Sequence, residues 1–130
     1  MKDLCPPGWP RPKGYSNAMA ARGRIVMTAG VVGWNERQEF VDKTLAGQFA
    51  QTLRNIVAIL QCDGAYPKNI ARLTCYVTSI DEYLASAKEI GAAWREIMGR
   101  HYPAMALVEV VRLVEREAKV EIEATAVVPE

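Results

Sequence analysis

The chain has 130 residues, half of them hydrophobic, which is enough for one domain with a buried core. Lys and Arg number 16 and Asp and Glu 15, so a net charge of +1 gives no long-range attraction to nucleic acid or to an anionic membrane. No apolar run approaches the roughly 18–20 residues of a membrane span, and the start carries no apolar signal core, so we expect a cytoplasmic protein.

The cysteines are Cys5, Cys62 and Cys75, and no pair has CxxC spacing, which favours free thiols over a disulfide framework. Cys62 and Cys75 fall on apolar faces and are expected to be buried and inert, whereas Cys5 is the expected reactive thiol. His101 is the single histidine, so no ligand spacing supports a zinc site. We expect neither a metal nor another cofactor.

The N-terminal half contains an arm, a strand and a helix. Residues 1–14 predict an extended arm, because prolines at 6, 7, 10 and 12 are incompatible with a helix or a central strand. Residues 24–33 are apolar and β-branched and predict a buried strand. Residues 42–62 predict a helix with one apolar face, formed by Ala46, Phe49, Ala50, Leu53, Ile56, Val57 and Leu60.

The C-terminal half predicts three strands and a second helix. Residues 70–78 form the first strand, and the sequence SIDE at 79–82 predicts a capping box that opens a helix to about Met98. Residues 104–113 and 119–128 predict two further strands. The last strand alternates, with one face formed by Val120, Ile122, Ala124 and Ala126 and the other by Glu121, Glu123 and Thr125.

This order of elements predicts a single α+β domain over residues 1–130, with two helices packed on one face of a mixed sheet. The predicted strands 24–33 and 104–113 are apolar on both faces. The second face of the sheet is therefore expected to be buried as well, most simply against copies of the same chain. We expect a homo-oligomer.

Five segments of the chain together match the pattern of a known family: GYSNA at 14–18, IVMTAGVVG at 25–33, Gln48 through Asn55-Ile56 with Leu60, YPAMALVEVVRL at 102–113 and KVEIEATA at 119–126. Through them, nearly the whole chain from about Gly14 resembles the RidA/YjgF family, which is also known as endoribonuclease L-PSP or translation initiation inhibitor. The resemblance implies a chorismate-mutase-like subunit, a trimer with a barrel core, and active clefts between subunits. Well-known members hydrolyse enamines and imines such as 2-aminoacrylate to 2-keto acids and ammonia.

Position 105 departs from the family. Catalytic members have Pro-Ala-Arg followed by Ser or Thr, and the planar guanidinium holds the substrate carboxylate with two hydrogen bonds. This chain has Met105 followed by Ala106. A thioether has neither charge nor a donor, and losing a buried charged pair typically costs about 2–5 kcal/mol. Met105 either fills a packing gap or forms an apolar cleft floor that changes the substrate class.

The resemblance also implies roles for other residues of the cleft. Glu121 matches an acidic residue that positions water or transfers a proton, and Tyr15 matches a tyrosine that lines the cleft. Gly30 matches the glycine of a Ser-Gly-Gln turn where backbone approaches the ligand, with Val31 in place of the glutamine. We expect Glu121 to be catalytic and the others to bind substrate, together with the backbone of Ala106.

Five further residues have two readings each. Trp34 is a cleft wall or a loop anchor, and His101 is a residue of the cleft mouth or a cap. Glu123 is solvated or paired across a subunit boundary. Arg24 and Arg112 are alternative cations for a carboxylate, although Arg24 is more simply solvated and Arg112 more simply structural.

The sequence therefore predicts a hydrolytic enamine or imine deaminase with an altered substrate class, acting on a small molecule between the subunits of a homotrimer. The alternative is a trimer that binds a small ligand without catalysis. An endoribonuclease follows only from the family's other name, and the near-neutral charge without a basic stripe argues against it.

Overall fold

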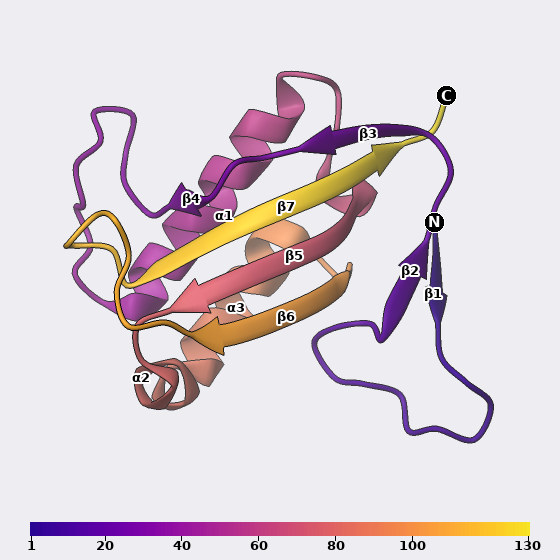
Figure 1. Cartoon of the computed structure of the whole chain (residues 1–130), viewed down its shortest axis with the longest axis horizontal. Helices are drawn as coiled ribbons and strands as arrows, with labels where there is room; N and C mark the ends of the chain where they lie inside the picture. Colours follow the sequence, from indigo (N-terminus) through magenta and orange to yellow (C-terminus); the bar gives the residue numbers. More distant parts are fainter.

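The computed structural model describes all 130 residues and contains a mixed sheet with helices on one face (Figure 1). The sheet has the order β3-β7-β5-β6, and β4 also pairs with β7. β5 and β6 are parallel, while the other pairings are antiparallel. The strands are β3 (Arg24–Met27), β4 (Val31–Val32), β5 (Ile70–Val77), β6 (Ala104–Glu109) and β7 (Val120–Val128).

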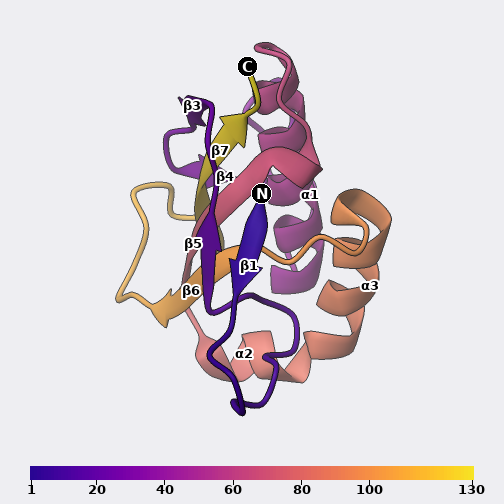
Figure 2. The ribbon, with the colours of Figure 1, turned by 90° about the vertical axis from the view of Figure 1, so that its right-hand side faces the viewer.

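Helices α1 (Leu45–Gln61) and α3 (Ala87–Met98) cover the same face of the sheet, and no helix covers the other (Figure 2). The predicted apolar face of α1 is confirmed, because Phe49, Leu53, Ile56 and Leu60 are at most 1% exposed; Val57 at its margin is partly buried. The helix begins at Thr44, whose hydroxyl accepts a hydrogen bond from the Gly47 N–H at 3.0 Å. The α+β prediction with helices on one face is confirmed.

β7 shows the predicted alternation. Val120, Ile122, Ala124 and Ala126 are at most 3% exposed and pack under the helices. The residues between them, from Glu121 onward, consequently project from the uncovered face. The central strand therefore carries apolar groups on one side and carboxylates on the other.

The prediction of one continuous strand over residues 24–33 is wrong. Pairing with β7 advances four residues from Met27 to Val31 while β7 advances three, so the chain contains a bulge. At the bulge, the Thr28 N–H donates to the carbonyl of Ala124, and the Thr28 hydroxyl accepts from the N–H of Ala124. This hydroxyl substitutes for the backbone carbonyl that a regular strand would offer.

The single helix predicted from 80 to 98 is also divided. α2 (Ile80–Ala85) and α3 meet at Ser86, which caps both. The predicted capping box forms only by half: the Ser79 hydroxyl accepts from the Glu82 N–H at 3.0 Å, but the Glu82 carboxylate turns away to α1. The strand predicted over 104–113 ends at Glu109, because the chain leaves the sheet in a loop there.

The N-terminal arm is extended, and it is tied to the rest of the chain. β1 (Lys2–Leu4) pairs antiparallel with β2 (Ala18–Ala20) to form a separate two-stranded ribbon beside the main sheet (Figure 1). A short 3₁₀ helix (Pro67–Asn69) precedes β5. No helix combines the length and apolar character needed to cross a bilayer.

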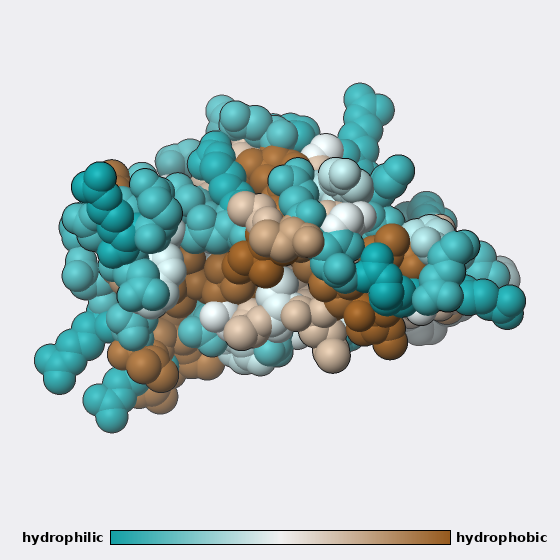
Figure 3. Space-filling view, turned by 90° about the horizontal axis from the view of Figure 1, so that it is seen from above, coloured by the Kyte–Doolittle hydropathy of each residue, from teal (hydrophilic) through white to brown (hydrophobic).

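The uncovered face of the sheet leaves apolar side chains in solvent. Ile25 and Met27 on β3 are 62% and 72% exposed, and Val108 on β6 is 46% exposed. Seen from above, hydrophobic surface alternates with hydrophilic residues (Figure 3). A strand with large apolar side chains this exposed is typical of a surface that packs against another chain.

Candidate functional site

The bulge between β3 and β4 places Gly30 directly against Glu121. A β-carbon at Gly30 would lie 2.4 Å from Glu121 Oε2, so only glycine allows the carboxylate to rest there. Glu121 is half-buried on β7 and none of the ion pairs in the chain includes it. The family resemblance assigned both residues to the cleft, and in the structure they lie against each other.

Glu123, two residues along β7, has a different environment. The Tyr76 hydroxyl donates to Glu123 Oε1 at 2.9 Å, and this hydrogen bond raises the pKa of Tyr76. Tyr76 stands opposite Glu121 in the β5–β7 register, yet its hydroxyl is directed to Glu123. Of the two carboxylates, Glu121 is the one without a side-chain hydrogen-bond partner, so it is free to interact with a ligand or a water molecule.

A second group of predicted residues lies on the other side of the sheet. Met105 pairs in register with Leu73 on β5 and so faces the helices. Met105 and Tyr15 line one hollow of about 360 Å³ together with Lys13, Gly14, Tyr83 and Leu107. The structure therefore brings Tyr15 and Met105 together, but not beside Glu121.

The loop that carries Tyr15 is fixed to the start of β6. The Ser16 N–H donates to the carbonyl of Pro103 at 3.0 Å, and its hydroxyl donates to the carbonyl of Tyr102 at 2.5 Å. Ser16 also forms a parallel bridge with Ala104. These contacts hold Ser16 against the start of β6, and so they also position its neighbour Tyr15 there.

A cavity of about 280 Å³ adjoins this hollow and lies between α3, α2 and β6. It shares Gly14, Tyr83 and Met105 with the hollow, and the rest of its wall is Phe49, Ala87, Ile90, Gly91, Trp94, Arg95 and Tyr102. Trp94 and Tyr102 stack with their planes 4° apart, and the Trp94 indole N–H donates to the carbonyl of His101. Burial raises the pKa of Tyr83. The wall is mostly apolar and aromatic.

Three further residues predicted to contact the substrate, Val31, Trp34 and Ala106, lie away from the Tyr15–Met105 hollow. Val31 is buried in the core opposite Ile122, so its side chain faces the helices. Trp34 packs against Phe40 with ring centroids 5.7 Å apart, which favours the role of a loop anchor over that of a cleft wall. Ala106 pairs with Thr74 and faces the side of the sheet opposite to Met105.

The residues weighed as alternative cations or cleft groups lie away from Met105. Arg24 pairs with Asp63 at the surface, and His101 Nε2 lies 2.6 Å from the carbonyl of Ile70. Arg112 lies on the exposed loop after β6, in a separate hollow near Lys43. None of these three lines either hollow that Met105 lines.

The cysteine predictions divide. Cys75 is fully buried, and burial raises the pKa of its thiol to about 12, so it is inert as predicted. Cys62 is exposed at the end of α1, and the prediction that it is buried is wrong. The buried face of α1 ends two residues earlier, at Leu60. No three His, Cys, Asp or Glu side chains are grouped to hold a metal.

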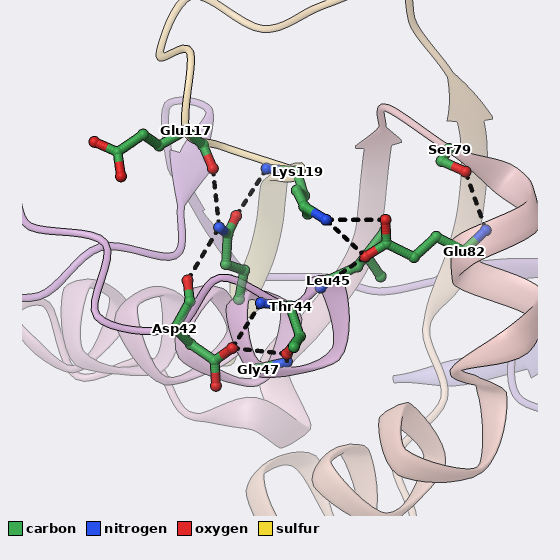
Figure 4. Close-up of polar contacts among 9 residues, drawn as sticks. Asp42, Thr44, Leu45, Gly47, Ser79, Glu82, Glu117 and Lys119 are labelled. Carbon is green, nitrogen blue, oxygen red and sulfur yellow. Dashed lines mark hydrogen bonds and ion pairs between the residues drawn. The ribbon is translucent and has the colours of Figure 1, made fainter.

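Gln48 and Asn55, two polar residues of α1 in the segment that resembles the family, bond to the backbone of neighbouring loops. Gln48 is fully buried: its amide donates to the carbonyls of Asp42 and Glu117, and its oxygen accepts the Lys119 N–H (Figure 4). Asn55 donates to the carbonyls of Val32 and Trp34 at 3.0 and 2.7 Å. These amides fix the loop that follows β4 and the loop that precedes β7, which orients the strands that carry the site.

Glu82 and Lys119 form an ion pair beside the N-terminus of α1. The Glu82 carboxylate accepts from the Leu45 N–H at 3.0 Å and pairs with Lys119 Nζ at 3.1 Å (Figure 4). α1 has no acidic residue in its own first turn, so a carboxylate from α2 complements the positive end of its dipole. We call this cluster of Asp42, Thr44, Gln48, Glu82, Glu117 and Lys119 the α1 N-terminal network.

Sequence reasoning placed Tyr83 and Trp94 on the inward face of the second helix but did not identify Arg95 or Gly91. The only signal for them was a glycine in the middle of a helix, followed four residues later by arginine on the same face. The proximity of Gly91 and Arg95 to Met105 could not be predicted from the sequence, because β6 and α3 meet only through the packing of the helices on the sheet.

Comparison with known proteins agrees with this fold. The sequence profile of the family described as Endoribonuclease L-PSP matches residues 10–128. The chain is 30% identical over 108 residues to a 2-iminobutanoate/2-iminopropanoate deaminase of Escherichia coli, covering 81% of this chain and 80% of the relative. It is 34% identical over 119 residues to a RutC family protein of Pyrococcus horikoshii, covering 90% of each.

Solved structures give the same result. A protein of unknown function of the conserved Rid family from Yersinia pestis superposes with a TM-score of 0.83 at 30% identity, covering 98% of both chains. The YjgF gene product of Escherichia coli superposes with a TM-score of 0.68 at 28% identity, again over 98% of both chains.

Proposed function

Because the chain belongs to the endoribonuclease L-PSP family, which includes RidA and YjgF, we propose that it is a hydrolytic deaminase of a small enamine or imine. The observation that carries this proposal is Glu121, a half-buried carboxylate that rests on Gly30 and has no cation beside it. A related protein is named for the deamination of 2-iminobutanoate and 2-iminopropanoate.

In the proposed reaction, water adds to the carbon of the C=N bond. Glu121 accepts a proton from this water as the water oxygen bonds to the carbon, and then passes the proton to the imine nitrogen, which gives a carbinolamine. Glu121 then takes the proton of the carbinolamine hydroxyl and delivers it to the amino nitrogen as the C–N bond breaks, so that ammonia leaves and the C=O bond of a 2-oxo acid forms. No oxidant or reductant is needed, because hydrolysis leaves the oxidation state of the carbon unchanged.

The active form is proposed to be a homotrimer with the cleft between subunits. Glu121 and Met105 lie on opposite faces of the sheet, so one chain does not bring them to a common cavity. The exposed apolar residues of the uncovered face, such as Ile25 and Met27, support packing of that face against a neighbour. Glu121 of one subunit would then approach the Tyr15–Met105 hollow of the next.

Within this cleft, Tyr15 and the backbone at Gly30, Val31 and Ala106 are proposed to hold the substrate. Met105 is proposed as an apolar floor. Trp34 is left out, because it packs against Phe40 as a loop anchor.

The test is turnover by the Glu121→Gln variant. Ammonia release from 2-imino acids generated in situ should fall about 100- to 10,000-fold, the range for loss of a general base, while the melting temperature stays within a few degrees. The matched control is Glu123→Gln, one pleat away on the same strand face, which should keep most of the activity. Equal activity of Glu121→Gln and the parent protein would refute the role of Glu121.

The absence of arginine at position 105 supports a second candidate, a trimer that binds a small ligand without catalysis. That protein would release no ammonia from any imine and would bind ligand equally well with glutamine at 121. Cleavage of RNA that falls steeply with salt would point instead to the ribonuclease that the family's description names.

A further inference from the structure

The cavity between α3 and β6 contains hydrogen-bond donors and no carboxylate. Among its lining residues, Arg95 is the only charged one. Arg95 belongs to none of the five ion pairs in the chain, and the arginines that donate side-chain hydrogen bonds are Arg11 and Arg24. Arg95 is exposed at the rim of this apolar cavity, so its guanidinium is accessible to an anion that enters the cavity, and its planar fork suits a carboxylate.

Gly91 indicates that the space beside Arg95 is kept open. Glycine inside a helix is less favourable than alanine, so a mid-helix glycine usually has a packing or functional reason. Packing does not require it here: a β-carbon at Gly91 would meet only Arg95 Nη1, at 3.5 Å, an ordinary contact. Glycine does, however, widen the cavity where a larger side chain would project into it.

The rest of the wall is suited to an apolar or aromatic group. Phe49 and Tyr83 pack with ring centroids 6.1 Å apart, Trp94 and Tyr102 stack, and Met105 supplies a polarizable thioether that favours aromatic contacts. The volume of about 280 Å³ is near the low end of the roughly 300–1,000 Å³ of small-molecule pockets, which suits one amino-acid-sized metabolite.

We propose that Arg95 binds the carboxylate of the substrate in this cavity, and that the apolar wall selects a 2-imino acid with an aromatic or large branched side chain. This proposal rests on the proposed deaminase function, because that function supplies the 2-imino acid class. The cation for the carboxylate is then on α3, and position 105 contributes to side-chain selectivity.

Binding tests this proposal independently of catalysis. The probes are phenylpyruvate and pyruvate, stable 2-oxo acids that differ only in the side chain, titrated calorimetrically into the full-length protein. Phenylpyruvate should bind at least about 10-fold more tightly than pyruvate, and Arg95→Gln should weaken phenylpyruvate binding about 10-fold or more. Lys88→Gln, which removes an exposed charge from the same helix outside the cavity, should leave affinity unchanged.

A second variant fills the cavity without removing charge. Gly91→Met places a flexible side chain where glycine leaves space and improves helix propensity, so the protein should fold and phenylpyruvate binding should be lost. Arg95 also lies in the last turn of α3, where a cation suits the helix dipole, so stability of every variant is measured alongside affinity.

The outcomes separate the two proposals. Equal affinity of Arg95→Gln and the parent protein, or no preference for phenylpyruvate, would refute the site even if imines are hydrolysed. Arg95-dependent binding without any release of ammonia would support the site and refute the deaminase. Arg95-dependent binding together with Glu121-dependent turnover, faster on the imine of phenylalanine than on that of alanine, would support both.

Discussion

The α1 N-terminal network and the cavity beside α3 differ in whether their polar side chains have partners within the chain. In the network, the buried amide of Gln48 uses both its nitrogen and its oxygen, and Glu82 bonds both a helix N–H and a lysine. Beside α3, Arg95 has no ion pair. Buried polar groups that are fully satisfied stabilise a unique fold, whereas an exposed, unpaired side chain at the rim of a cavity is available to a ligand. Changes in the first region should therefore affect stability, and changes in the second should affect function.

The largest stability effect is expected at Gln48. Gln48→Leu removes three hydrogen bonds and leaves backbone groups of Asp42, Glu117 and Lys119 without their partner. At about 1–3 kcal/mol for each unsatisfied buried group, and less than full additivity, the free energy of unfolding should fall by about 3–5 kcal/mol. Urea denaturation measures this, and a loss below about 1 kcal/mol would show that the loops re-pair without the amide.

The buried thiol of Cys75 should make the free energy of unfolding decrease at high pH. The folded-state pKa of about 12 lies above the ordinary value of 9.0, so the contribution to stability is complete below pH 9 and is lost as pH rises towards 12. Three pH units correspond to at most about 4 kcal/mol. Denaturation midpoints of Cys75→Ala should fall less steeply between pH 9 and 12 than those of the parent protein, and parallel curves would contradict the burial of the thiol.

A smaller loss is expected at Asn55, the other amide of α1. Asn55→Ala removes the donors to the carbonyls of Val32 and Trp34 and should cost about 1–3 kcal/mol. Gln61→Ala, at an exposed position at the end of the same helix, is the control and should change stability by less than about 0.5 kcal/mol. Similar losses in both variants would mean that the helix, and not the bonds to the β4 loop, accounts for the effect.

The smallest effect has the opposite sign and lies beside α3. Gly91→Ala should raise the free energy of unfolding by about 0.5–1 kcal/mol, because alanine favours the helix and the added β-carbon meets nothing closer than 3.5 Å. Thermal unfolding gives the comparison. Destabilisation would show that packing demands this glycine and would remove the reason to regard the cavity as kept open.

Much of the fold followed from local pattern. Periodicity in α1 and alternation in β7 identify buried faces directly, because each residue's burial depends on its position within its own element. The division at Ser86 and the bulge before Val31 could not be predicted, since they depend on how a helix meets its neighbours and on a hydroxyl that replaces a strand carbonyl.

The sequence by itself determined the elements, the family resemblance and the absence of arginine at position 105. Only the tertiary structure decided which residues meet. It placed Glu121 against Gly30, where the register of β4 on β7 controls the distance, and it placed Arg95 on the cavity that Met105 also lines. Such contacts join residues far apart in the chain, and their geometry depends on the packing of a whole helix layer on a sheet rather than on any local pattern.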